Sequence, residues 1–274
     1  MELSEQLKTY LAQPNPDLLE ASLLVARHAQ PSLVTAQYTG CVNAWAIDLA
    51  ERLDGLKDER AKLKRINDFI FRELGFSGNH EDYYDPRNNM INHVIERRKG
   101  IPITMAVLYI TLAQRVGLQV EGASFPGHFL VKMNLDEGLI VLDPFNKGVS
   151  LGEDDLKTLL EYNNLNTDTE MLSASLRTAT LEETILRMLR NLKAVYIKDR
   201  QQEAALETLN LMLSINPKLV EERRERGLLL RDMGCNHTAL LDLNSYMERS
   251  KKEDRIAEIR PVVVDLLRNT PPLH

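Results

Sequence analysis

Three residues whose side chains can take part in acyl transfer follow one another along the chain: Thr104, His128 and Asp143. A nucleophile–His–Asp set places its nucleophile at the start of a helix, where free N–H groups and the helix dipole stabilise an anion. It also needs a histidine that accepts the proton and a carboxylate that fixes the histidine tautomer. The order of the three residues matches such a set, with a hydroxyl in the nucleophile's position.

The segments around these residues have the elements that would position them. "RRKGIPITMAVLY" (97–109) is typical of a tight turn that leads into a helix, and apolar residues on all sides predict a buried helix over 103–115. Three runs rich in β-branched and aromatic residues follow and predict strands: "LQVEGASF", "HFLVKM" and "LIVLDPF". "NLDEG", between the last two runs, predicts a hairpin turn.

The predicted hairpin relates His128 to Asp143. A turn centred on Leu135 and Asp136 would place the two residues directly opposite each other, with Cβ atoms about 5 Å apart. A slip of one residue would undo this pairing, because turn length fixes the register. We therefore expect an imidazole and a carboxylate within reach of each other, either in a functional pocket or as a purely structural pair.

Thr104, in the nucleophile's position, is harder to activate than a cysteine would be there. A nearby imidazolium and a helix dipole can convert a cysteine to a thiolate at neutral pH, whereas a threonine hydroxyl needs a full general base. Threonine nucleophiles usually rely on their own terminal amine, and Thr104 is internal. We expect Thr104 to act as the N-cap of the buried helix, and the alternatives are a nucleophile or a hydroxyl that contacts a ligand.

Longer stretches resemble one bacterial family. "YYDPRNNMINHVIERRKGIPITMAVLY", "GLQVEGASFPGHFLVKM" and "LDPFNKG" are together similar to the transglutaminase-like/TPR (tetratricopeptide repeat) proteins of the SirB-one type, from about residue 35 to the C-terminus. The resemblance implies a transglutaminase-like α+β core followed by TPR helices. It also implies that a hydroxyl residue replaces the superfamily's catalytic cysteine at Thr104, and that His128 and Asp143 occupy the superfamily's His and Asp positions.

The stretch "SGNHEDYYDPRNNM" predicts a long loop, because it concentrates Gly, Asn, Asp and Pro. In the family that the chain resembles, this segment leads directly into the core motif, so we expect Asp85, Arg87 and Asn92 to line a pocket; a solvated loop is the alternative. His80, Glu81 and Asp82 are consecutive and lack the spacing of metal ligands. No metal or cofactor is therefore expected.

The C-terminal part repeats itself with an offset of 34 residues, the TPR period: Ala205 matches Ala239, and Leu209 matches Leu243. The pattern predicts two repeats and a capping helix over 180–270. Four arginines lie on faces that the repeat template assigns to the concave groove, which suggests an acidic peptide or a terminal carboxylate as partner, although ordinary solvated arginines are the alternative. These residues are Arg187, Arg190, Arg224 and Arg231.

Composition limits the remaining possibilities. The net charge of −6 argues against nucleic acid as a partner, and no apolar stretch reaches the length of a membrane span. Cys41 and Cys235 are far apart in predicted helices, so we expect no disulfide and a cytoplasmic location.

The sequence thus predicts an α+β protein with a papain/transglutaminase-like core, made of a buried helix and a small antiparallel sheet. We expect a helical region over 1–75 that packs on a core over 76–165, and TPR-like repeats over 180–270. The function expected first is a non-catalytic protein-binding or regulatory module. The alternatives are a hydrolase or acyltransferase that uses Thr104 or a water activated by His128 and Asp143, and a plain structural scaffold.

Overall fold

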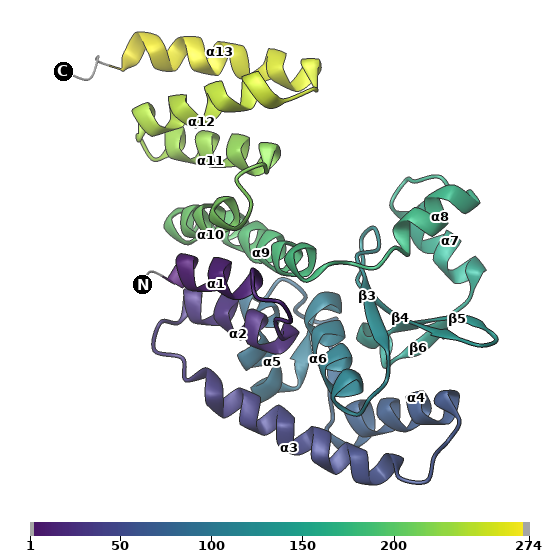
Figure 1. The fold of residues 1–274 in the computed structure, drawn as a ribbon. Coiled ribbons are helices and arrows are strands. Elements are labelled where there is room, and N and C mark those ends of the chain that lie inside the picture. Colours follow the sequence, from purple (N-terminus) through teal and green to yellow (C-terminus); the bar gives the residue numbers. More distant parts are fainter. Residues whose placement is uncertain (1–2, 271–274) are drawn as a thin grey trace. The chain divides into compact units, whose positions relative to one another are not determined.

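A computed structural model describes residues 3–270, which form two compact units (Figure 1). The first unit holds residues 9–188, and the second holds residues 189–270 together with residues 3–8. Two helices contribute residues to both units: α1 (Leu3–Leu11) and α9 (Leu181–Lys198).

The first unit combines helices with two small sheets. Its other helices are α2 (Leu18–Ala29), α3 (Thr35–Leu53), α4 (Glu59–Asn67), which continues into a π-helical turn (Asp68–Glu73), α5 (Ile91–Arg97), α6 (Pro102–Arg115), α7 (Glu153–Tyr162) and α8 (Thr169–Ser175), and short 3-10 helices cover Pro86–Asn89 and Pro144–Asn146. Its strands are β1 (Ser77–Gly78), β2 (Lys99–Gly100), β3 (Val120–Ala123), β4 (Leu130–Leu135), β5 (Gly138–Asp143) and β6 (Val149–Leu151).

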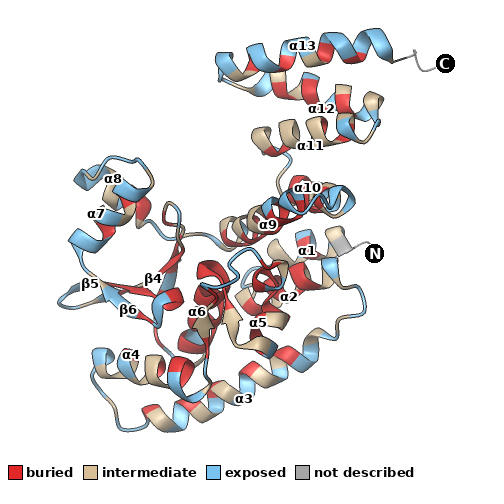
Figure 2. Cartoon of the chain, turned by 180° about the vertical axis from the view of Figure 1, so that it is seen from behind, coloured by how far each residue is buried: buried red, intermediate tan, exposed pale blue. Residues whose placement is uncertain are grey.

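Helix α6 forms the centre of the first unit. Every residue from Pro102 to Ala113 is buried, as the apolar composition predicts (Figure 2). Helices α2, α3 and α5 pack against it, and so do strands β3 and β4. Residues near the start of this helix are therefore held from several sides.

The larger sheet is antiparallel, with the strand order β3-β4-β5-β6. Helix α6 contacts the sheet, and α7 with α8 covers a separate apolar cluster against it. This cluster contains Phe125, Leu130, Val141, Leu156 and Leu160. Strands β1 and β2 form a separate parallel pair.

The predicted register of the hairpin is wrong by two residues. Leu135 pairs with Gly138 and the turn lies at Asp136 and Glu137, so the register, continued by one residue, places Asp143 opposite Leu130. His128 comes before strand β4 and is not part of it. A shift of two residues preserves the face on which a side chain lies, because side chains alternate with a period of two. The error therefore leaves Asp143 opposite Leu130, only two residues after His128.

The second unit consists of helices that pack in sequence. The helices are α10 (Gln202–Ile215), α11 (Val220–Asp232), α12 (Asn236–Arg249) and α13 (Glu253–Asn269), preceded by the end of α9. Residues matched by the 34-residue offset have the same environment: Ala205 and Ala239 are fully buried, as are Leu209 and Leu243. A Cβ atom at Gly227 would lie 2.8 Å from the Leu243 side chain, so only glycine lets α11 and α12 approach this closely.

Candidate functional site

Thr104 is the third residue of helix α6 and not its N-cap. The N-cap is Ile101, which provides no side-chain hydrogen bond. Thr104 Oγ1 instead accepts a hydrogen bond from the backbone N–H of Ile101 (3.1 Å), which is one half of a capping box. The predicted N-cap role is therefore wrong in position, although the hydroxyl does satisfy a backbone donor at the start of the helix.

The Thr104 hydroxyl also donates to a distant segment. Its Oγ1 lies 2.8 Å from the carbonyl oxygen of Asn88 and 3.2 Å from that of Ile101, and the side chain is fully buried. A Cβ atom at Gly100 would lie only 2.8 Å from the hydroxyl, so the oxygen packs directly over this glycine. The hydroxyl thus ties the start of α6 to the 3-10 helix Pro86–Asn89, which comes before α5.

His128 and Asp143 lie together, at the end of β5. Nε2 of His128 is 2.8 Å from Oδ1 of Asp143, and their side chains are 12% and 5% exposed. This distance is that of an ion pair, although the ring N–H is not aligned for a hydrogen bond. Asp143 Oδ1 also accepts hydrogen bonds from the backbone N–H groups of Phe145 and Asn146, and Oδ2 accepts one from the Asn146 side chain. The carboxylate is therefore fixed in place from both sides.

These contacts set the charge state of the carboxylate. Burial by itself would raise the pKa of Asp143, but His128 and the donors of Asn146 outweigh burial and hold the pKa below its ordinary value. The folded protein thus favours the ionised form of Asp143 more than the unfolded chain does.

We expect a pH-dependent contribution of Asp143 to stability. Because its pKa is lower in the folded state, the stabilisation is complete above the unfolded pKa, about 4, and is lost as the pH falls through the folded pKa. At pH 6 Asp143→Asn should lower the free energy of unfolding by about 1–2 kcal/mol. Urea unfolding of both proteins from pH 3 to pH 6 measures this difference, which should shrink below pH 4. A difference that stays constant over this range would contradict the assignment.

The structure does not join Thr104 to the His128–Asp143 pair. The hydrogen bonds of Thr104 within residues 3–270 go to Asn88 and Ile101, and none goes to His128. The three residues predicted as a set therefore divide into a histidine–aspartate pair and a separate, buried threonine.

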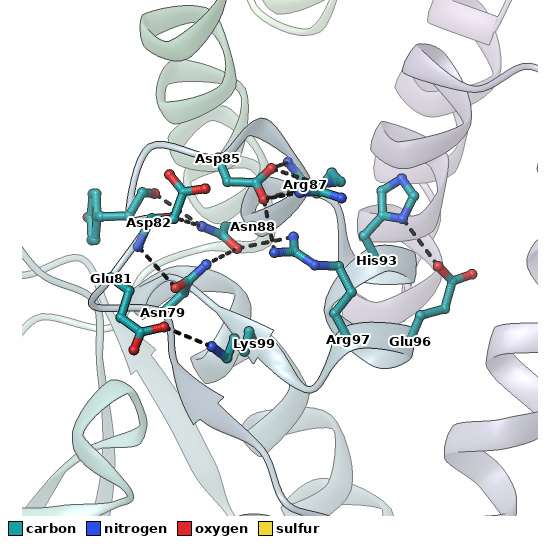
Figure 3. A network of polar contacts seen from close by, with 11 residues as sticks. Asn79, Glu81, Asp82, Asp85, Arg87, Asn88, His93, Glu96, Arg97 and Lys99 are labelled. Carbon is teal, nitrogen blue, oxygen red and sulfur yellow. Dashed lines mark hydrogen bonds and ion pairs between the residues drawn. The ribbon is translucent and has the colours of Figure 1, made fainter.

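Asp85 and Arg87 take part in a polar network (Figure 3). Asp85 is buried, and Oδ2 lies 2.8 Å from Arg87 Nη2 and 2.9 Å from Arg97 Nη2. Burial raises the pKa of Asp85, but the two arginines outweigh it and keep this pKa below its ordinary value. Asn88 accepts from Asn79 (3.1 Å) and donates to the carbonyl oxygen of Asp82 (2.7 Å). The network fixes the loop whose Asn88 carbonyl receives the Thr104 hydroxyl.

Asn92 has a different environment from Asp85 and Arg87. Its side chain is buried and donates to Gln30 Oε1 on the neighbouring helical segment (3.0 Å). The three residues predicted to line one pocket thus have distinct structural contacts, and pocket lining remains a prediction for all of them.

The structure also identifies residues near His128 that the prediction did not assign to this site. The ring of Phe145 lies edge-on to the His128 ring at 6.0 Å, and the rings of His80 and Tyr83 contact Phe145 at 4.3 and 6.0 Å. The aromatic residues of the loop "NHEDYYDP" were the only sequence signal for this cluster.

The four predicted partner-binding arginines have different contacts, although Arg187 and Arg190 lie on the same helix, α9. Arg187 belongs to the first unit, where Nη1 lies 3.3 Å from Ser124 Oγ and Nη2 lies 3.5 Å from the carbonyl oxygen of His128. The other three are in the second unit and pair with acidic residues of this chain: Arg190 with Glu222 (2.6 Å), Arg224 with Glu221 (3.3 Å) and Arg231 with Asp232 (2.6 Å).

Among residues 3–270, no three His, Cys, Asp or Glu side chains are arranged to hold a metal ion. None of the helices in this range combines the length and the apolar character that a membrane span requires.

A helix-and-sheet core with an ordered histidine–aspartate pair, followed by helical repeats, defines a transglutaminase-like protein with TPR repeats. The model of the transglutaminase-like superfamily matches residues 36–190, and a tetratricopeptide repeat model matches residues 192–264. The chain belongs to the SirB1/UPF0162 family of transglutaminase-like/TPR proteins. The family and the α+β fold class predicted from the sequence are both confirmed.

Relatives from several bacteria support this assignment. A UPF0162 protein of Xylella fastidiosa (strain Temecula1) is 35% identical over 251 residues, which cover 91% of this chain and 89% of that protein. SirB1 of Salmonella typhimurium is 28% identical over 210 residues, which cover 76% of this chain and 77% of SirB1.

Among solved structures, menin aligns with 99% of this chain and 78% of its own, at 11% identity and a TM-score of 0.42.

Proposed function

We propose that this chain is a non-catalytic protein-binding module of the cytoplasm, in which the transglutaminase-like core serves as a scaffold. The observation that carries this proposal is the state of the Thr104 hydroxyl. It is fully buried and its hydrogen bonds go to the backbone of Asn88 and Ile101. A nucleophile must reach a substrate carbon and have a base within hydrogen-bond distance, and this hydroxyl meets neither requirement.

The partner is a protein or a peptide. TPR repeats suggest protein–protein interaction, which supports this part of the proposal. A partner with acidic residues would have to compete with Glu222, Glu221 and Asp232 for the arginines of the second unit. The two cysteines are both unpaired thiols, which are usual in the reducing cytoplasm.

A hydrolase that activates water is the second candidate function. The short contact between His128 Nε2 and Asp143 Oδ1 favours it, because a carboxylate beside one imidazole nitrogen stabilises positive charge on the ring while the other nitrogen acts as a base. Water would then replace Thr104 as the nucleophile.

An acyl-transfer assay tests the proposal. Purified wild-type protein, His128→Ala, Thr104→Ala and Thr104→Ser are compared for hydrolysis of p-nitrophenyl acetate and for amine incorporation into dimethylated casein. We expect all four proteins to match the uncatalysed rate. A wild-type rate that His128→Ala abolishes, with an unchanged near-ultraviolet circular dichroism spectrum, would overturn the proposal. In that case, loss in Thr104→Ala but not in Thr104→Ser would identify a threonine nucleophile, and activity in both would identify water.

A further inference from the structure

The outer side of helix α13 carries apolar side chains that are open to solvent. Its inner side packs against α12 and contributes to a buried cluster with Ile256, Ile259, Val263 and Leu266. On the outer side, Val264 is 46% exposed and Leu267 is 59% exposed. The last helix of a repeat array usually has a polar outer side. Helix α13, the last helix within residues 3–270, departs from this rule.

The exposed residues of α13 form a continuous stripe. They recur every three or four positions, and residues at this spacing lie on one side of a helix. We call them the α13 stripe: Glu253, Ala257, Arg260, Pro261, Val264, Leu267 and Arg268, all of which are exposed (Figure 2). The stripe thus has an acid at its first end, an arginine at its last end and, apart from Arg260, apolar residues between them.

The charges at the two ends of the stripe have no ion-pair partner within residues 3–270. Glu253 is the first residue of α13, and Arg268 lies in its last turn. The ion pair that α13 does form joins Arg255 to Glu221 of α11 (3.1 Å), and Arg255 lies outside the stripe. A partner that covers the stripe would therefore not have to break existing ion pairs.

The order of these charges suits a second copy of the same helix that runs in the opposite direction. If a two-fold axis passes just before Pro261, positions at equal distances from the axis face each other. Glu253 then faces the partner's Arg268, and Ala257 faces the partner's Val264. A parallel arrangement would instead bring equal charges together. The stripe is thus complementary to itself in the antiparallel arrangement, as an interface with two-fold symmetry requires.

We propose that two copies of this chain associate through the α13 stripe, with their α13 helices antiparallel. Pro261 and Val264 supply the apolar contacts near the axis, and pairs of Glu253 with Arg268 hold both ends. Arg260, close to the axis, covers apolar surface with its stem and keeps its guanidinium in water. This inference goes beyond the proposed function and does not depend on it.

The size of the contact sets the expected affinity. One pair of helices buries less than the roughly 1,200 Å² that stable interfaces bury in total, so the dimer should form reversibly with a Kd of about 100 µM. Sedimentation equilibrium of the full-length chain from about 10 to about 500 µM covers this range. We expect the mass to rise from that of a monomer towards that of a dimer. A chain that remains monomeric at every concentration would overturn the inference.

A substitution in the apolar part locates the contact. Val264→Glu should weaken the dimer at least about tenfold, because two carboxylates per dimer would lose water at the interface. Leu241→Glu is the control: it adds the same charge in α12, at a leucine that is 72% exposed and outside the stripe, and should leave the affinity unchanged. Circular dichroism checks that both variants keep their helix content. Equal affinities of the two variants would place the contact elsewhere and overturn the inference.

Reversal of the end charges tests the antiparallel arrangement. Glu253→Arg and Arg268→Glu each place like charges opposite each other at both ends of the dimer, and each should weaken it about tenfold. A mixture of the two variants should recover the wild-type affinity, because Arg and Glu then face each other at both ends of the mixed dimer. Reversals without effect, or a mixture as weak as its components, would overturn the arrangement.

Discussion

Thr104→Val is expected to lower the free energy of unfolding by about 2 kcal/mol. Valine keeps the shape of threonine but removes the hydroxyl, so the carbonyl oxygen of Asn88 and the N–H of Ile101 each lose a buried partner. Thr104→Ser keeps both hydrogen bonds and should cost only about 1 kcal/mol for the lost methyl group. Urea unfolding followed by circular dichroism measures both values.

Thr111→Val is the matched control for this prediction. Thr111 is buried in the same helix, but its hydroxyl donates only to the Val107 carbonyl one turn earlier. Helical carbonyls at this spacing already accept a backbone hydrogen bond, so this substitution should change stability little. If the two valine variants were equally stable, the Thr104 hydroxyl would have no special structural role and the main support for a non-catalytic core would be lost.

Asp242→Ala is expected to destabilise the second unit by about 3 kcal/mol. Asp242 is buried in α12, where it accepts two hydrogen bonds from Arg226, at 2.6 and 2.8 Å, and pairs with Arg223 at 3.3 Å. Its removal would leave two mostly buried guanidinium groups without their carboxylate, and an unpaired buried charge is costly. Thermal and urea unfolding of the full chain, followed by circular dichroism, measure this effect.

Asp232→Ala provides the comparison on the surface. Asp232 pairs with Arg231 at 2.6 Å, but both side chains are substantially exposed, and such pairs contribute about 0–1 kcal/mol. Similar losses for the two variants would contradict the conclusion that burial distinguishes these ion pairs. The result also matters for binding, because it measures how firmly the arginines of the repeats are held by acids of the same chain.

Local sequence patterns predicted α6, strands β3 to β5 and the repeat helices, but not β1, β2, β6, α7 or α8. The almost wholly apolar run predicted α6, because a helix that is apolar on all sides must be buried. The 34-residue offset predicted that Ala205 and Ala239 have the same environment, and both are fully buried. The hairpin was predicted correctly, but its turn was placed one residue too early along the chain, and this moved the pairing register by two residues.

The sequence by itself determined that a hydroxyl, an imidazole and a carboxylate occur in the order of a catalytic set, and that the last two lie near each other. The proximity of His128 and Asp143 survived the register error because His128 lies only two residues before Leu130, the residue that the register places opposite Asp143. Only the tertiary structure decided what each group contacts. Thr104 bonds to a carbonyl 16 residues away, Arg190 to an acid 32 residues away, and Arg187 to groups 59 and 63 residues away. Such partners depend on how separate elements pack, whereas periodicity and propensity report only interactions between near neighbours in the chain.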